Sequence, residues 1–576
     1  MADTRENRWF ILPIVGWLPK YQPAWLRFDL VAGLTLAAYA VPVSLAYAGL
    51  AGLPPQMGLY CYLLAGLGYA LFGSSRHLAI GPTSAISLLV GVTLAGLAAG
   101  DAARREALAS LTALIVAGVF ALAWLLRLSV LVNFISESVL TGFKAGAALV
   151  IASTQLPKLF GVKGGGDDFF ERMAQLVQQV PGTSLLTLAI GVGAILALLL
   201  GEKFLPGRPA ALAVVLLALA VASLGQIDQY GVKIVGQLPA GLPHFLVAGA
   251  SLGTVRAEEL RQLIHLAFAC FLLAYIESIS SARTCALKHR YTVDPSQEFL
   301  GLGAASLLVG LWQGFPVAGG LSQSAVNEQA GARTPLSLAF ASAVIALVLV
   351  FFTSFFQRLP ETVLAAIVLI AVKGLIDLKE LRYLWHASRI DFGAAGVALG
   401  GVLVMGILDG VIVAVLASVV MLLSRVARPH VAFLARIPGT HRFSDVARHP
   451  ENEPIPGVLA FRVEASLVYF NADHVLQTVL QRVQSESELQ RVVYDLSTTP
   501  YVDVAGARML RRLHDELASK KIGLRVVGAH GEVRDRLRFE KLQDWVGPIN
   551  RHVSLGEAVG MGTLPVEPQS HDEISK

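Results

Sequence analysis

Residues 336–357 read LSLAFASAVIALVLVFFTSFFQ and contain no charged residue. A helix needs roughly 20 mostly apolar residues to cross the hydrocarbon layer of a bilayer, so this stretch is long enough to span one. Residues 107–126, 209–226, 392–408 and 410–424 are also free of charge. They lack the two-residue alternation of barrel strands, and therefore predict membrane helices. A soluble all-helical core is the alternative, but it would need polar faces on most of its helices.

The same pattern extends along most of the chain. Only 15% of all residues are charged, whereas soluble domains carry about 25%. We expect about fourteen membrane segments, near 29–48, 56–72, 80–98, 107–126, 130–155, 183–201, 209–224, 258–282, 297–313, 321–332, 336–356, 361–376, 392–408 and 410–424. An even number of spans places both termini on one side of the membrane.

Basic residues indicate which side that is. They gather after the eighth span (residues 283–290), after the twelfth (373–389) and after the last (425–428). All three connections lie on the side of the N-terminus, which the positive-inside rule assigns to the cytoplasm. Met1–Arg8 is polar and lacks the features of a secretory signal. We therefore expect a multi-pass protein of the cell (inner) membrane, and the net charge of +5 does not indicate nucleic acid as a partner.

The composition changes after Arg428. Charges become frequent, and residues 459–464, 491–496 and 524–528 are strand-like, with helical patterns at 474–483 and 505–517. This alternation predicts a small α/β domain. The expected organisation is a cytoplasmic N-terminal segment (1–28), a transmembrane transport domain (29–428), a linker (429–457), the α/β domain (458–560) and a disordered tail (561–576).

Two membrane segments begin in an unusual way. Residues 73–85 and 315–325 each combine a short extended run, a Gly/Pro break and small hydroxyl residues that open a helix. Interrupted segments at matching places in two halves of a transporter indicate its binding site, and these lie seven spans apart. Each helix start offers unpaired N–H groups and about half a positive charge, so two facing starts would attract an anion. Ordinary helix kinks are the alternative interpretation.

Glu277 lies inside an apolar span, where an ionisable side chain is costly and usually functional. A carboxyl group in such a place suits a proton carrier. It could instead bind Na⁺ together with Ser281, one turn later, or form a structural hydrogen bond between helices. Glu137 and Lys144, seven residues apart, are interpreted as structural or domain-interface residues.

Other classes of chemistry find little support. The three cysteines have no CxxC spacing, which argues against a zinc site or a disulfide framework. No GxxxxGK[ST] loop is present, so we expect no ATP hydrolysis, and no nucleophile–base arrangement stands out. The sequence thus predicts a protein that is not an enzyme and that uses no cofactor.

Several motifs resemble the sulfate permease (SulP) family. They are DLVAGLT at 29–35, VPVSLAYA at 41–48, AGLPP at 51–55 and the two interrupted segments. The resemblance implies a uracil-permease-like fold of two inverted seven-helix repeats, in which core and gate domains move against each other like an elevator. It also implies a homodimer and a proton-coupling role for Glu277. The substrate site that it implies consists of Tyr47, Thr83, Ser84, Ala85, Leu321 and Ser322, together with Gly320 of the same motif.

Two positions depart from the family pattern. Val43 stands where many members have Gln, and Gln323 stands where many have a basic residue. These changes make a monovalent or weakly charged anion such as bicarbonate more plausible here than in a typical sulfate transporter. Residues 493–496 and 501–506 resemble the STAS domain that follows the membrane part in this family. Ala505 occupies the place of the phosphorylated Ser in related anti-sigma factor antagonists, which excludes that regulation here.

The sequence therefore predicts a secondary active transporter of small inorganic anions, with sulfate as the first candidate and H⁺ or Na⁺ as the coupling ion. A bicarbonate or C4-dicarboxylate transporter, an uncoupled anion channel and a nucleobase permease remain open. Besides the anion and the coupling ion, the expected partners are membrane lipid and a second copy of the chain.

Overall fold

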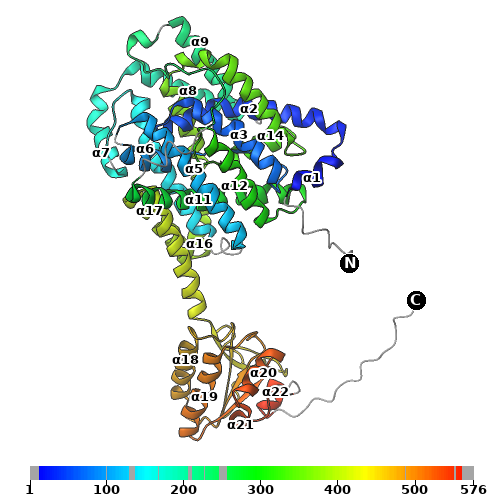
Figure 1. Cartoon of the computed structure of the whole chain (residues 1–576). Helices are drawn as coiled ribbons and strands as arrows, with labels where there is room; N and C mark the ends of the chain where they lie inside the picture. Colours follow the sequence, from blue (N-terminus) through cyan, green and yellow to red (C-terminus); the bar gives the residue numbers. More distant parts are fainter. Residues whose placement is uncertain are drawn as a thin grey trace. The chain divides into compact units, whose positions relative to one another are not determined.

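The protein is described here by a computed structural model, shown in Figure 1. The description covers residues 12–98, 100–128, 136–166, 168–204, 210–225, 227–245, 256–486, 488–549 and 553–560. The chain divides into two compact units, Met1–Val419 and Val420–Lys576. The expected disordered tail, 561–576, lies outside the described residues, as do the first eleven residues of the N-terminal segment.

The first unit is almost entirely helical. Its long or apolar helices are α2 (Leu26–Leu50), α3 (Pro55–Phe72), α4 (Ser84–Leu97), α5 (Ala102–Leu125), α6 (Glu137–Phe160), α8 (Leu185–Phe204), α9 (Ala210–Gly225), α11 (Ala257–His289), α12 (Pro295–Leu311), α13 (Leu321–Gln329), α14 (Leu336–Leu347), α15 (Glu361–Lys373) and α17 (Arg389–Ala427). Each predicted membrane segment overlaps one of these helices. Residues 392–408 and 410–424 share α17, which is broken by Gly406 at φ 84°.

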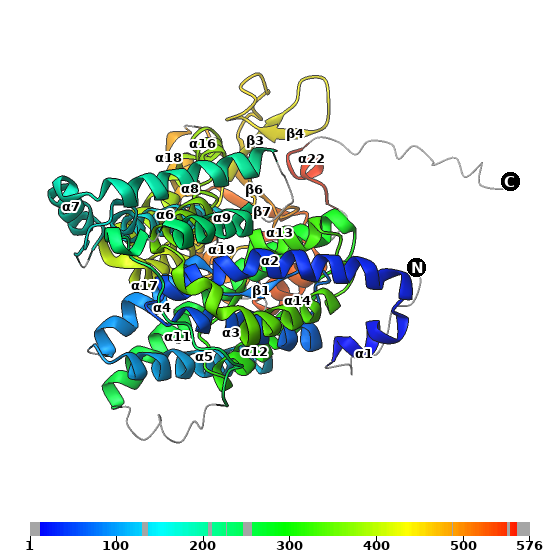
Figure 2. The same cartoon turned by 90° about the horizontal axis from the view of Figure 1, so that it is seen from above.

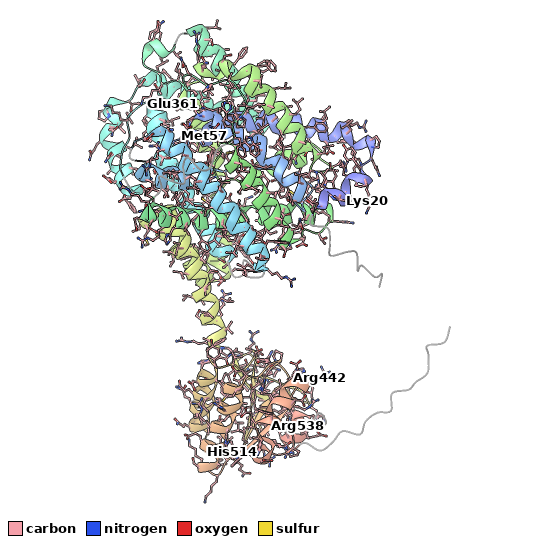
Figure 3. The ribbon with its side chains drawn as sticks, in the orientation of Figure 1. Lys20, Met57, Glu361, Arg442, His514 and Arg538 are labelled. Carbon is pink, nitrogen blue, oxygen red and sulfur yellow. The ribbon has the colours of Figure 1, made fainter. Side chains whose placement is uncertain are left out.

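Not every helix is long enough to cross a bilayer unaided. By length and composition, seven helices of the described residues qualify, and Ser84–Leu97, Ala210–Gly225 and Ile412–Ala427 are shorter apolar helices. Three short helices lie outside the predicted spans: α1 (Pro13–Trp17), α7 (Phe169–Gln179) and α16 (Leu378–Ala387). In Figure 3, Lys20 lies at the periphery of this unit, and the buried Met57 lies within it.

Helices from the two halves of the first unit pack on each other. Helix α12 packs on α5 and α3, and α3 in turn packs on α14 and α12. The views of Figures 1 and 2 both place α5 beside α12. A second group is formed by α15 with α6 and α8. This arrangement agrees with two related halves that contribute to two groups of helices.

Close contacts hold α2 against α3 and against the connection between α13 and α14. A Cβ added to Gly58 of α3 would overlap the main-chain oxygen of Ser44 in α2, so glycine permits this approach. The fully buried Asp29 of α2 accepts hydrogen bonds from the backbone N–H groups of Arg333 and Thr334, at 2.7 and 3.1 Å, and from the Thr334 hydroxyl. These bonds hold the connection between α13 and α14 against α2.

The second unit contains a five-stranded sheet in the order β4-β3-β5-β6-β7. Its strands are β3 (Val431–Arg436), β4 (Phe443–Asp445), β5 (Val458–Val463), β6 (Arg491–Asp495) and β7 (Gly523–Val527). The pairs β5–β6 and β6–β7 are parallel, and the pairs of β3 with β4 and β5 are antiparallel. Helices α18 (Ala472–Ser485), α19 (Val504–Ser519), α20 (Gly531–Phe539), α21 (Gln543–Val546) and α22 (Leu555–Ala558) complete the unit.

This unit differs from expectation at its start. Residues 429–457, expected as a linker, contribute β3 and β4 to the sheet. Strand β3 (VAFLAR) does not alternate between apolar and polar residues, and β4 is only three residues long, so neither gives a clear strand pattern in the sequence. The stacked rings of Phe461 and Tyr494, with centroids 4.4 Å apart, lie in the core between β5, β6 and the helices.

Candidate functional site

The two interrupted segments meet inside the first unit. Strand β1 (Ile80–Gly81) pairs in antiparallel fashion with β2 (Ala318–Gly319), so that Ile80 faces Gly319 and Gly81 faces Ala318. Glycine is required at both crossing strands. A Cβ on Gly81 would lie 2.6 Å from the Tyr62 ring, and a Cβ on Gly319 would lie 2.7 Å from the Leu78 side chain.

A helix begins directly after each strand. Thr83 precedes α4 and Gly320 precedes α13, both with extended backbone, and neither helix start receives a hydrogen bond from a capping side chain. The first N–H groups of both helices therefore remain available. The Thr83 hydroxyl also has no hydrogen-bond partner, although Thr83 is only 8% exposed. The geometry thus provides two uncapped helix ends with an unused hydroxyl group between them.

Both helix starts line one cavity of about 120 Å³, which is partly open to solvent. Of the predicted site residues, Tyr47, Thr83, Ser84, Gly320, Leu321 and Ser322 line this cavity, as do Glu277 and Ser281. Ala85 does not line it: it is 3% exposed and lies within the first turn of α4. The structure therefore brings together eight of the nine residues that we named from the sequence.

Glu277 faces the cavity from the middle of α11. Its Oε2 atom is buried without a hydrogen-bond partner, and Thr83 lines the same cavity. Ser278 accepts a hydrogen bond from the Gly319 N–H at 2.7 Å, which fixes α11 against β2. The Ser281 hydroxyl donates to the Glu277 main-chain oxygen at 2.8 Å. The described residues contain no group of three or more His, Cys, Asp or Glu side chains that could hold a metal ion.

Several lining residues were not predicted to belong to the site. Tyr39, Lys144 and Ser280 line the cavity, and Lys144 had been interpreted as structural. Its position inside an apolar span is the signal that could have identified it. Val43 and Gln323, noted as departures from the family pattern, also line the cavity. Gln323 donates to the Ala318 oxygen at 3.0 Å and accepts from the Tyr62 hydroxyl, so its amide group supports the crossing strands.

A second cavity adjoins the first. The two share the lining residues Tyr39, Val43, Ser322, Ala371 and Gly374, so they lie next to each other. The second cavity reaches the ends of three helices, at Glu202 of α8, Ala210 of α9 and Lys373 of α15. The second cavity therefore lies between the first cavity and the side of the unit where α8 and α15 end and α9 begins.

Comparisons with known proteins agree on one family. Residues 26–398 match the sulfate permease family and residues 449–556 match the STAS domain. A protein of Mycobacterium tuberculosis named as a probable sulfate transporter is 33% identical over 551 residues, covering 94% of this chain and 98% of the relative. Low affinity sulfate transporter 3 of Stylosanthes hamata is 31% identical over 580 residues, covering 95% of this chain and 89% of the relative.

Solved structures share the fold. The murine Solute Carrier 26 family member A9 anion transporter, in an inward-facing state, superposes with a TM-score of 0.85 at 22% identity, covering 96% of this chain and 94% of that one. The transmembrane domain of the cyanobacterial bicarbonate transporter BicA gives a TM-score of 0.59 at 22% identity, covering 69% of this chain and 98% of that one. The predicted fold, a polytopic helical membrane domain followed by a STAS domain, is thus confirmed.

Proposed function

This chain belongs to the sulfate permease family, and on that basis we propose that it is a secondary active transporter of sulfate that couples uptake to protons through Glu277. Anion transport itself agrees with the family and with relatives that are named transporters rather than enzymes. The choice of sulfate rests on the names of those relatives. Proton coupling rests on the buried carboxylate that faces the same cavity as the two helix starts.

One observation carries the proposal for the binding site. Two uncapped helix N-termini, those of α4 and α13, line one cavity beside the unpartnered Thr83 hydroxyl. Backbone N–H groups and the positive ends of helix dipoles favour a negative charge without a fixed cation, and hydroxyl groups donate to any oxyanion. In this proposal the anion lies between Thr83, Ser84, Leu321 and Ser322.

The walls of the cavity support an elevator-like movement. Tyr47, Thr83, Glu277 and Ser322 come from α2, the start of α4, α11 and α13. The facing wall comes from α6 and α15, which pack on each other in the second helix group. A site divided between two groups can open to either side when one group slides past the other. If the N-terminus is cytoplasmic, the adjoining cavity opens toward the cytoplasm.

The decisive experiment is an uptake panel. The purified full chain is reconstituted into liposomes and offered labelled sulfate, bicarbonate, fumarate and uracil, with and without Na⁺ and with and without an inward proton gradient. We expect saturable sulfate uptake that the proton gradient drives and that does not need Na⁺. Uptake that depends on Na⁺ would show that Na⁺, and not H⁺, is the coupling ion. An uncoupled anion current would favour a channel. Uptake of uracil alone, or of bicarbonate but not sulfate, would overturn the proposed substrate.

A further inference from the structure

The cavity carries one fixed positive charge that sequence reasoning did not assign to it. Among the described residues on its walls, Lys144 is the single cation and Glu277 is the single carboxylate. Opposite charges that line one cavity attract each other, although no direct ion pair joins Lys144 and Glu277 in this structure. They come from different helices, Lys144 from α6 and Glu277 from α11. The cavity therefore contains one ammonium and one carboxylate that do not share a helix.

The packing of α6 explains why Lys144 faces inward. A Cβ on Gly142 would overlap the Ala395 main-chain oxygen of α17, and a Cβ on Gly146 would lie 2.9 Å from the Val402 side chain. Gly142 and Gly146 are four residues apart and share one face of the helix. Lys144, midway between them, projects from the other face. The close contact with α17 thus turns the ammonium group toward the cavity.

Lys144 lines the same cavity as Gln323, the position where many family members have a basic residue. Gln323, at the start of α13, is hydrogen-bonded to Tyr62 and Ala318 and carries no charge. Lys144 restores a positive charge to the cavity, but from the facing helix group, in which α6 packs on α15 and α8. This charge offsets the sequence-based argument that the cavity is too weakly positive for a divalent oxyanion.

Other titratable groups near the pair do not change the balance. Tyr39 and Tyr47 of α2 complete the titratable groups on the described walls of the cavity. The adjoining cavity adds Glu202 from α8 and Lys373 from α15, one charge of each sign. The pair of Lys144 and Glu277 therefore dominates the charge at the helix starts.

We propose, building on anion transport as the function, that Lys144 binds the transported anion and is released to do so only when Glu277 takes up a proton. While Glu277 is ionised, its carboxylate is the counter-ion of the ammonium group. A proton from solvent neutralises the carboxylate, and the ammonium group then attracts the anion at the starts of α4 and α13. An unpaired buried charge is strongly disfavoured, so the anion and the proton bind together and leave together.

This arrangement makes a prediction for each partner of the pair. Removing the ammonium group weakens anion binding, and removing the carboxylate charge leaves the ammonium group permanently available. Lys144→Met should raise the KM for sulfate by about tenfold or more, within the usual range of coupling between two sites. Lys144→Arg keeps the charge and should stay close to wild type. Glu277→Gln should lower the KM at alkaline pH and abolish its dependence on pH.

The test measures sulfate uptake by full-length protein in liposomes as a function of pH, and the exposed Lys163→Met serves as the charge control. The double variant Lys144→Met/Glu277→Gln should show a raised KM without pH dependence. A wild-type KM and pH profile in Lys144→Met would overturn the assignment of Lys144. If the wild type transports no anion, the proposed function itself fails, which separates the two outcomes.

A second measurement does not depend on the folding of a variant. In the wild-type protein, an amine-reactive label and mass spectrometry report the reactivity of Lys144 relative to Lys163. Sulfate should slow the labelling of Lys144 and leave Lys163 unchanged. Equal labelling of Lys144 with and without a saturating concentration of sulfate would contradict contact between its ammonium group and the anion.

Discussion

Ile80 pairs with Gly319, although the two residues belong to opposite halves of the membrane domain. This pairing fixes the short strands that precede α4 and α13, and it places Thr83 and Ser322 on the wall of one cavity. The Gly319 N–H also donates to the Ser278 hydroxyl, next to Glu277 in α11. One crossing point therefore positions both helix starts and the carboxylate.

Filling the space between the helix starts should block transport. In Ser322→Leu, a larger apolar side chain occupies the cavity and removes a hydroxyl donor. Misfitting insertions of this kind cost about 1–3 kcal/mol, which corresponds to roughly fivefold to 150-fold in binding. We expect sulfate uptake to fall at least by that factor, with normal membrane insertion. Thr35→Leu is the control, because the Thr35 hydroxyl bonds only to Val31 of its own helix. Normal uptake by Ser322→Leu would contradict the placement of the site.

Glu277→Gln should separate binding from coupling. The amide preserves the shape of the side chain but cannot carry a proton through the transport cycle. We expect exchange of sulfate across the liposome membrane to persist, whereas accumulation driven by a proton gradient is lost. Both activities are measured at several pH values in the same preparation. Accumulation at wild-type level would remove Glu277 from the coupling role.

The contact of α2 with α3 should tolerate no side chain at Gly58. Gly58→Ala places a methyl group against the main-chain oxygen of Ser44, and overpacking of this kind costs about 1–3 kcal/mol. We expect a lower thermal unfolding temperature in detergent. Gly49→Ala is the matched control, because nothing lies within 4 Å of a Cβ at that position. Equal unfolding temperatures for the two variants would show that the helices can separate without cost.

The STAS unit should lose stability in acid through Asp445. Partial burial raises the pKa of this carboxyl group, but the hydrogen bonds from His430, at 2.8 Å, and from the Ala447 N–H outweigh it, so that the net pKa lies below the ordinary value. A lowered pKa stabilises the folded state above the unfolded-state pKa of about 3.9, and this stabilisation disappears as the pH falls through the folded-state value.

Circular dichroism across a pH series measures this loss of stability as unfolding in acid. We expect Asp445→Asn to lower stability near neutral pH and to flatten the dependence below about pH 4. The exposed Asp515→Asn is the control. If Asp445→Asn unfolds along the wild-type acid limb, the bond to His430 contributes nothing to folding.

The sequence predicted the elements whose signal is local. Long apolar stretches placed the membrane helices, and the breaks at Gly81-Pro82 and Gly319-Gly320 placed the two helix starts. The short apolar run in residues 491–496, read as a buried strand, predicted β6. These features depend on length, period and backbone freedom, which a single segment carries by itself.

Other features depend on which segments meet. Lys144 lines the cavity because Gly142, on the other face of α6, packs against Ala395, which lies far away in the sequence. Ala85 follows Thr83 and Ser84 along the chain, yet the turn of α4 points it into the packed interior. Strand β3 joins the sheet by pairing with β5, and no pattern in residues 429–457 predicts this pairing. Tertiary packing decides such positions.

The central claim, that the starts of α4 and α13 hold the anion, is tested most directly by a structure determined with selenate, a heavier analogue of sulfate. The account predicts anomalous density within hydrogen-bonding distance of the backbone N–H groups or hydroxyls of both Ser84 and Ser322. Density at another place in the membrane domain, or contact with only one of the two helix starts, would contradict it.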